Sequence, residues 1–80
     1  MSNLLYRDHT IVSSAVHDDA GGNWKITAYV SWAEDGSPSR RLHFIRNNAE
    51  RFSRFEDAEM AGMERAKNWV DSHLHLRELG

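Results

Sequence analysis

The sequence predicts an α+β fold in which a three-stranded antiparallel meander is covered on one face by a long C-terminal helix (β-β-β-α). Three observations predict it: helical spacing of apolar residues over 53–75, alternation of apolar and polar residues over 24–33, and a turn-forming segment on each side of that alternation. A chain of 80 residues suits a single domain that spans residues 1–80.

The helix is predicted to run from residue 53 to about residue 75, with residues 76–80 as a frayed tail. Ser53 and Glu56 have the spacing of a capping box. At 100° per residue, the small and apolar side chains fall on one arc. That arc contains Phe55, Ala58, Gly62, Met63, Ala66, Trp69, Val70, His73 and Leu74. The small residues recur every four positions, so we expect the helix backbone to approach the sheet closely along them.

The strands are predicted over residues 9–17, 24–33 and 40–47, with turns over 18–23 and 34–39 and a crossover to the helix over 47–52. The central strand has the clearest pattern, because every second residue is apolar. Its inward residues are predicted to be Trp24, Ile26, Ala28, Val30 and Trp32. For residues 1–8 two alternatives stay open: Leu4, Leu5 and Tyr6 begin a strand, or they cap one end of the core.

In the third strand we expect Leu42 and Phe44 to face the helix, and His43 and Ile45 to face the other side. The uncovered face of the sheet is then expected to carry Lys25, Thr27, Tyr29, Ser31, Arg41, His43 and Ile45. Ile11 and Ala15 are expected to join the apolar members of this face in a contact between two copies of the chain. The alternative is a solvated face with scattered apolar residues.

Charge is distributed unevenly along the chain. Residues 37–54 hold five arginines and one glutamate, a net +4, whereas the whole chain has a net charge of −2. A local positive charge of this size suits phosphate groups, but the overall acidity is unlike that of a dedicated nucleic-acid-binding domain. Some of the arginines are alternatively expected to pair with acids of the same chain or of a dimer partner. The candidate binding residues are Lys25, Tyr29, Arg40, Arg41, His43, Arg46, Arg51 and Arg54.

Motifs for catalysis and metal binding are missing from the sequence. It has no cysteine, no Gly-rich phosphate loop, no nucleophile elbow and no HExxH spacing. We therefore expect a protein that is not an enzyme and that has no metal and no cofactor. No apolar run approaches the roughly 18 residues of a membrane span, and a signal-peptide pattern is absent, so we expect a cytoplasmic protein.

A resemblance to a known family covers residues 40–71. The matching residues are Arg41 to Arg46, Phe52-Ser53, Glu56-Asp57-Ala58, Ala66-Lys67 and Val70-Asp71. This run resembles the haemolysin-activator (HlyU-like) regulators of proteobacteria, and it is similar to other short bacterial proteins of strand-strand-strand-helix type. Where such proteins carry an Arg-Ala-Asp run after the strand, this chain has Arg46-Asn47-Asn48. The resemblance implies a regulatory or binding module.

Two functions from different classes remain. The first is a small interaction module that forms a homodimer through the open sheet face or the helix rim, because a core of this size supplies only about 3–5 kcal/mol by itself. The second is a nucleic-acid-binding regulator that uses the arginine-rich third strand and crossover. Acidic residues at the helix start, among them Glu56 and Asp57, argue against a double-stranded-RNA-binding domain, which needs basic residues there.

Overall fold

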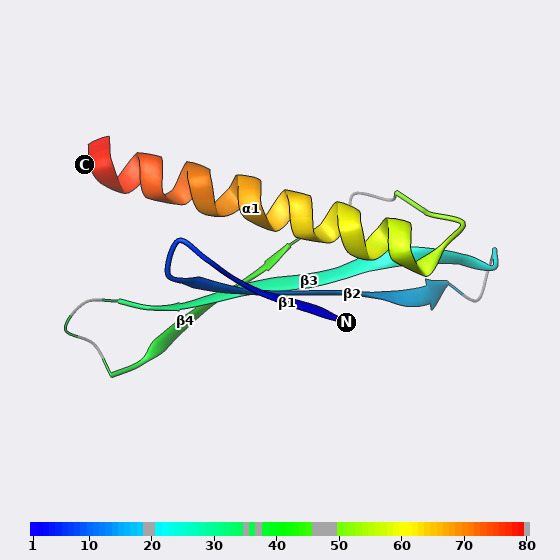
Figure 1. Ribbon diagram of the computed structural model, residues 1–80, viewed down its shortest axis with the longest axis horizontal. Coiled ribbons are helices and arrows are strands. Elements are labelled where there is room, and N and C mark those ends of the chain that lie inside the picture. Colours follow the sequence, from blue (N-terminus) through cyan, green and yellow to red (C-terminus); the bar gives the residue numbers. More distant parts are fainter. Residues whose placement is uncertain (19–20, 35, 37, 46–49, 80) are drawn as a thin grey trace.

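The computed structural model describes residues 1–18, 21–34, 36, 38–45 and 50–79, and it has an α+β architecture (Figure 1). The elements are β1 (Ser2–Tyr6), β2 (His9–Asp18), β3 (Asn23–Ala33), β4 (Arg40–Ile45) and α1 (Phe55–Leu79). The strands form one antiparallel sheet in the order β1-β2-β3-β4. The sheet thus has four strands instead of the predicted three, and α1 continues beyond residue 75 to Leu79, where a frayed tail was expected.

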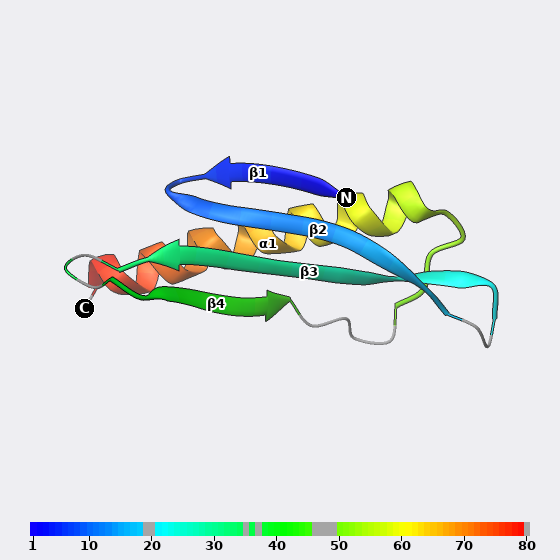
Figure 2. The same cartoon turned by 90° about the horizontal axis from the view of Figure 1, so that it is seen from below.

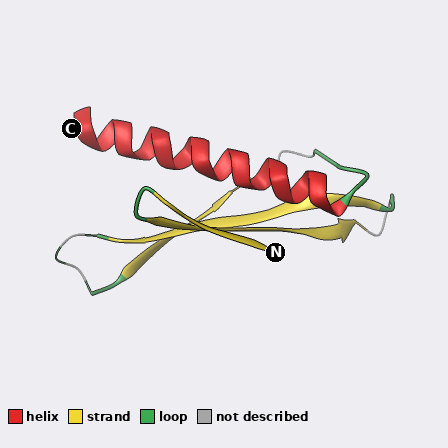
Figure 3. Cartoon of the chain, in the orientation of Figure 1, coloured by secondary structure: helices red, strands yellow, loops and turns green. Residues whose placement is uncertain are grey.

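Helix α1 lies along one face of the sheet and packs mainly on β2 and β3 (Figures 1 and 3). The buried apolar core lies between these two layers. Its members are Ile11, Ala15, Ile26, Ala28, Val30, Trp32, Ala58, Ala66 and Val70. The predicted inward face of the central strand is therefore confirmed, because four of its five residues are buried and Trp24 packs at the edge of the core. Ile11 and Ala15, which we expected on the open face, lie in this core instead.

The small residues of α1 are where the helix comes closest to the sheet. Ala58 and Ala66 are fully buried, and Gly62 lies between them. A Cβ atom built on Gly62 would lie 2.5 Å from the Ser13 hydroxyl and 2.8 Å from a methyl group of Ile26. The Ser13 hydroxyl donates a hydrogen bond of 2.7 Å to a carbonyl of the helix backbone, that of Glu59. The predicted close approach is confirmed, and a buried serine fits the seam because it has a helix carbonyl as its partner.

The start of α1 is shifted by one residue from the predicted cap. The amide of Ala58 donates to the carbonyl of Arg54 at 3.3 Å, which makes Arg54 the N-cap instead of Ser53. Glu56 and Asp57 lie in the first turn, where negative charge suits the positive end of the helix dipole. No helix in the described ranges is both long enough and apolar enough to cross a membrane.

Strand β1 resolves the two alternatives for residues 1–8, because it pairs with β2 from Ser2 opposite Ser13 to Tyr6 opposite His9. The connection is a two-residue hairpin turn in which Arg7 and Asp8 both have positive φ, 50° and 66°. This is the backbone of a type I′ turn, which usually contains Asn or Gly. His9 supports the turn, since its buried Nδ1–H donates to the Arg7 carbonyl at 2.8 Å.

The strained turn leads to a first prediction. Replacing Asp8 by glycine should raise the free energy of unfolding by about 0.5–1 kcal/mol, because glycine adopts positive φ without the steric cost of a Cβ atom. Urea unfolding of the variant measures this difference. Asp8→Ala is the matched control, and we expect it to show no such gain because alanine keeps the Cβ atom. A less stable Asp8→Gly variant would contradict this account of the turn.

A polar clamp joins the end of β1 to α1. The Tyr6 hydroxyl donates to both carboxylate oxygens of Asp71, at 2.9 and 3.1 Å, and the Arg7 guanidinium donates to Asp71 at 2.7 Å. Hydrogen bonds from Arg7 and Tyr6 hold the pKa of Asp71 below its usual value. The same carboxylate raises the pKa of Tyr6. The clamp therefore favours an ionised Asp71 and a neutral Tyr6.

This pKa shift predicts how stability depends on pH. The pKa of Asp71 is lower in the folded state than in the unfolded state. The clamp therefore makes its full contribution to the free energy of unfolding above the usual aspartate pKa of 3.8, and this contribution is lost as the pH falls through the lowered value. The urea midpoint of the wild type should therefore fall over this acidic range. Asp71→Asn should reduce that fall, and so should Arg7→Gln, because Arg7 is the partner that lowers the pKa of Asp71 most. Parallel curves for the wild type and Asp71→Asn would contradict the clamp.

The register of β4 reverses the facing that we predicted for the third strand. Residues directly opposite each other in an antiparallel pair point to the same face, and Val30, which faces α1, is opposite His43. His43 and Ile45 are thus on the helix side, and Leu42 and Phe44 are on the open face. The strand has apolar residues at both parities, so its own pattern did not determine which side faces inward.

The aromatic end of the core explains why His43 turns inward. Its ring stacks on Trp69 with centroids 4.2 Å apart and planes within 9°. On the other side of Trp69 the ring of His73 stacks, with centroids 4.8 Å apart and planes within 11°. The ring of Trp32 contacts Trp69 and His73. Flat rings from β3, β4 and α1 thus fill the space between the helix and this end of the sheet, with Trp69 among them.

Candidate interaction surface on the open sheet face

The face of the sheet opposite α1 is covered by no described element, and strand alternation determines which side chains it presents (Figures 2 and 3). Helix-facing residues occupy every second position, so the residues between them belong to the other face. The open face, as we call it, carries Asn3, Leu5, Thr10, Val12, Ser14, Val16, Lys25, Thr27, Tyr29, Ser31, Arg40, Leu42 and Phe44.

The centre of the open face is apolar. Val12, Tyr29 and Phe44 are directly opposite one another across β2, β3 and β4, and the rings of Tyr29 and Phe44 lie 6.0 Å apart. Leu5 and Leu42 belong to the next row across the sheet. Phe44 is 64% exposed, Leu42 is 54% exposed and Leu5 is 72% exposed. These five residues form the apolar patch. Contiguous exposed hydrophobic side chains of this kind are typical of an interaction site.

The residues predicted for binding separate into different places. Lys25 and Tyr29 are on the open face as expected. Arg40 is on this face instead of Arg41, and it donates to the Ser31 hydroxyl there at 3.1 Å. Arg41 and His43 have the opposite parity and belong to the helix side, which corrects the prediction for both. Arg46 lies outside the described residues.

The remaining arginines do not gather on one surface. Arg51 is next to Phe52, which pairs with Trp24 near the start of β3, whereas Arg41 is opposite Trp32 near its end. Eight residues of strand separate these tryptophans, which is about 26 Å. The expectation of pairing with acids of the same chain is met by three of these side chains: Arg41 with Glu34 at 3.3 Å, Arg51 with Asp18 at 2.6 Å and Arg54 with Glu56 at 3.7 Å. The described arginines thus form no continuous phosphate-binding patch.

The apolar patch contains residues for which the sequence predicted another position or none. Leu42 and Phe44 were predicted to lie in the core, and Leu5 had no assigned face. The turn at Arg7-Asp8 lacks the Asn and Gly residues that signal a hairpin. The sequence therefore did not indicate which face of the sheet the residues of β1 occupy. The signal that identifies Phe44 is its pairing with Tyr29, which depends on strand register and not on local pattern.

Together, the fold and this surface define a two-layer α+β domain that has one uncovered sheet face. Comparison with family models, with curated proteins and with solved structures finds no match for this chain. Among the described residues, no three His, Asp or Glu side chains come together in a way that could hold a metal ion.

Proposed function

We propose that the protein is a small interaction module that forms a homodimer through the open face of its sheet. The observation that carries this proposal is the apolar patch, in which Phe44, Leu42 and Leu5 are exposed around Tyr29 and Val12. Burying such a patch against a second copy would remove apolar surface from water at about 25 cal/mol per Å². In the resulting dimer each sheet would be covered on both faces, as in a sandwich of two sheets.

The shape of the chain supports an extended partner surface. Its principal dimensions are 45 × 24 × 17 Å, so it is a thin slab whose broad face is of the size that a stable dimer needs, about 800 Å² per partner. Its radius of gyration is 13.9 Å, compared with about 11.6 Å for a compact chain of this length. Its accessible surface is 5464 Å², compared with about 4,900 Å² for a compact monomer of this mass. A second copy that covered the open face would bury part of this excess surface.

The setting of this module follows from two further features. The lack of cysteine suits a reducing compartment, so we propose that the dimer acts in the cytoplasm. The resemblance to HlyU-like regulators supports a role in regulation through binding and not through catalysis. Nucleic-acid binding has less support, because the described arginines are divided between the two ends of β3.

Sedimentation equilibrium tests the proposal. The wild type should sediment with twice the chain mass of 9.2 kDa at micromolar concentration. Phe44→Glu should weaken association roughly thirtyfold or more, because a charge would enter the centre of a buried apolar contact. It should leave the monomer folded, since Phe44 is 64% exposed.

The matched control is Leu76→Glu, because Leu76 is 68% exposed but lies on α1 and not on the open face. This variant should dimerise like the wild type. A wild type that stays monomeric over a wide concentration range would refute the homodimer. A Phe44→Glu variant that remains as tightly dimeric as the wild type would show that the dimer uses another surface.

A further inference from the structure

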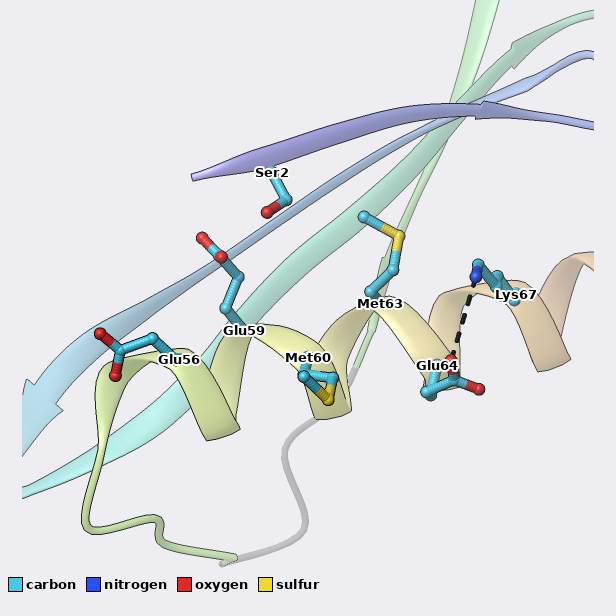
Figure 4. Close-up of a pocket in the computed structure, with 7 residues that line it drawn as sticks. All are labelled: Ser2, Glu56, Glu59, Met60, Met63, Glu64 and Lys67. Carbon is cyan, nitrogen blue, oxygen red and sulfur yellow. Dashed lines mark ion pairs between the residues drawn. The ribbon is translucent and has the colours of Figure 1, made fainter.

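A second surface lies on the other side of the molecule, in a groove between β1 and the first half of α1 (Figure 4). The groove has a volume of about 340 Å³. It is lined by Ser2, Glu56, Glu59, Met60, Met63, Glu64 and Lys67. The dimer proposed above does not use these residues.

One wall of the groove is an open edge of the sheet. β1 is the first strand in the sheet order and pairs on one side only, with β2. In an antiparallel pair, alternate residues direct their N–H and C=O groups away from the partner strand. This edge of β1 therefore offers backbone donors and acceptors to an extended chain that would lie beside it.

The other wall has three glutamates and one lysine. Lys67 approaches Glu64 at 3.9 Å, and Arg54 approaches Glu56 at 3.7 Å. Both of these contacts are longer than a hydrogen bond, so the two carboxylates can still accept from another cation. Glu59 points toward β1, and its carboxylate lies 2.8 Å from the amino-terminal nitrogen of Met1 (Figure 4). Hydrogen bonds from this ammonium group and from Ser2 lower the pKa of Glu59. The groove is thus suited to cationic groups and already holds one.

The spacing of the wall also matches an extended chain. Glu56 and Glu64 are eight residues apart on α1, about 12 Å, and Met60 lies midway between them. Side chains four residues apart on a strand are about 13 Å apart and point to the same face. Met60 is 65% exposed, and methionine adapts its shape to different apolar partners. A strand with basic residues at its first and fifth positions and an apolar residue at its third would complement this wall.

We propose that the groove binds an extended peptide segment of the pattern basic–x–apolar–x–basic, which adds to the edge of β1 as a further strand. The peptide backbone would pair with β1, its basic side chains would meet Glu56 and Glu64, and its apolar side chain would cover Met60. This surface is separate from the open face, so peptide and second copy can bind at the same time.

The test uses a short capped peptide of sequence Lys-Thr-Val-Thr-Lys and nuclear magnetic resonance of the isotopically labelled chain. Adding the peptide at low ionic strength should shift the backbone amide signals of residues 2–6. The charge-reversed peptide Glu-Thr-Val-Thr-Glu should not shift them. Equal shifts with both peptides, or shifts at Tyr29 and Phe44 in place of β1, would overturn the proposal.

Two variants sharpen the test. Replacing Glu56 and Glu64 together by glutamine should weaken peptide binding about tenfold, because both charge-assisted contacts to the basic side chains of the peptide are removed. Glu34→Gln is the control, since Glu34 pairs with Arg41 at the far end of β3, and it should bind as the wild type does. Unchanged affinity in the double variant would overturn the proposal. So would shifts of the β1 amides that grow with the concentration of the Phe44→Glu variant in the absence of peptide. This variant lacks the proposed dimer contact, so a second copy would then be the occupant of the groove.

The outcome is independent of the homodimer. Phe44→Glu, which removes the proposed dimer contact, should bind the peptide with the affinity of the wild type. If the dimer is refuted and the β1 amides still shift, the groove proposal stands alone. If Phe44→Glu abolishes the β1 shifts while the protein stays folded, the groove is not an independent site and the proposal fails.

Discussion

Replacing Trp69 by alanine should lower the free energy of unfolding by about 3 kcal/mol. The Trp69 ring is stacked between His43 and His73 and contacts Trp32, so its removal leaves three other rings without their partner. Truncation of a large aromatic side chain in a core costs about 3–5 kcal/mol, and the half-buried position of Trp69 favours the lower end. Because a domain of this size has about 3–5 kcal/mol in total, the variant should be close to unfolded.

Urea unfolding, followed by far-ultraviolet circular dichroism, measures this effect. Leu76→Ala is the matched control, since Leu76 is on the same helix but 68% exposed, and its unfolding free energy should change by no more than about 0.5 kcal/mol. A Trp69→Phe variant should recover part of the loss, because a smaller ring can still stack. A Trp69→Ala variant within about 1 kcal/mol of the wild type would contradict the packing described here.

Adding a single methyl group at Gly62 should also destabilise the fold, although alanine is the better helix former. The helix propensity gain is about 1 kcal/mol, but the new Cβ atom would lie 2.5 Å from the Ser13 hydroxyl and 2.8 Å from Ile26. Overpacking of this kind costs about 1–3 kcal/mol, and it would also disturb the Ser13 hydrogen bond to the helix carbonyl. We expect a net loss of about 1–2 kcal/mol for Gly62→Ala and a larger loss for Gly62→Val.

Thermal unfolding checks this prediction, since 1 kcal/mol corresponds to roughly 4–8 °C in a domain of this length. Ser72→Ala is the control, because Ser72 is an exposed position of α1 where alanine meets no neighbour from the sheet. That control should match the wild type or melt slightly higher. A Gly62→Ala variant that is more stable than the wild type would mean that the helix does not touch the sheet at this point.

Much of the fold could be predicted because its main contacts repeat along the chain. Alternation from Trp24 to Trp32 identified the inward face of β3, and the spacing of Ala58, Gly62 and Ala66 identified the face of α1. Both signals are local, since the period of each element states which residues lie on one side. The strand β1 had no comparable signal, because its hairpin turn uses Arg7 and Asp8 in place of Asn or Gly.

The candidate surface was harder to predict, because it depends on how elements meet. Tyr29 followed from the alternation of its own strand, but Phe44 and Leu42 required the register between β3 and β4. A shift of one residue in register moves every side chain of a strand to the other face. The arginines were close in sequence, but strand pairing placed Arg41 and Arg51 at opposite ends of β3.

The amino-acid sequence by itself determined the α+β class, the single C-terminal helix and the small-residue seam, because each follows from periodicity within one segment. Only the tertiary structure decided that β1 completes the sheet, that His43 packs against Trp69, and that Phe44 is exposed. The physical reason is that facing and edge position arise from hydrogen bonds between strands far apart in the chain, and no single segment encodes that pairing.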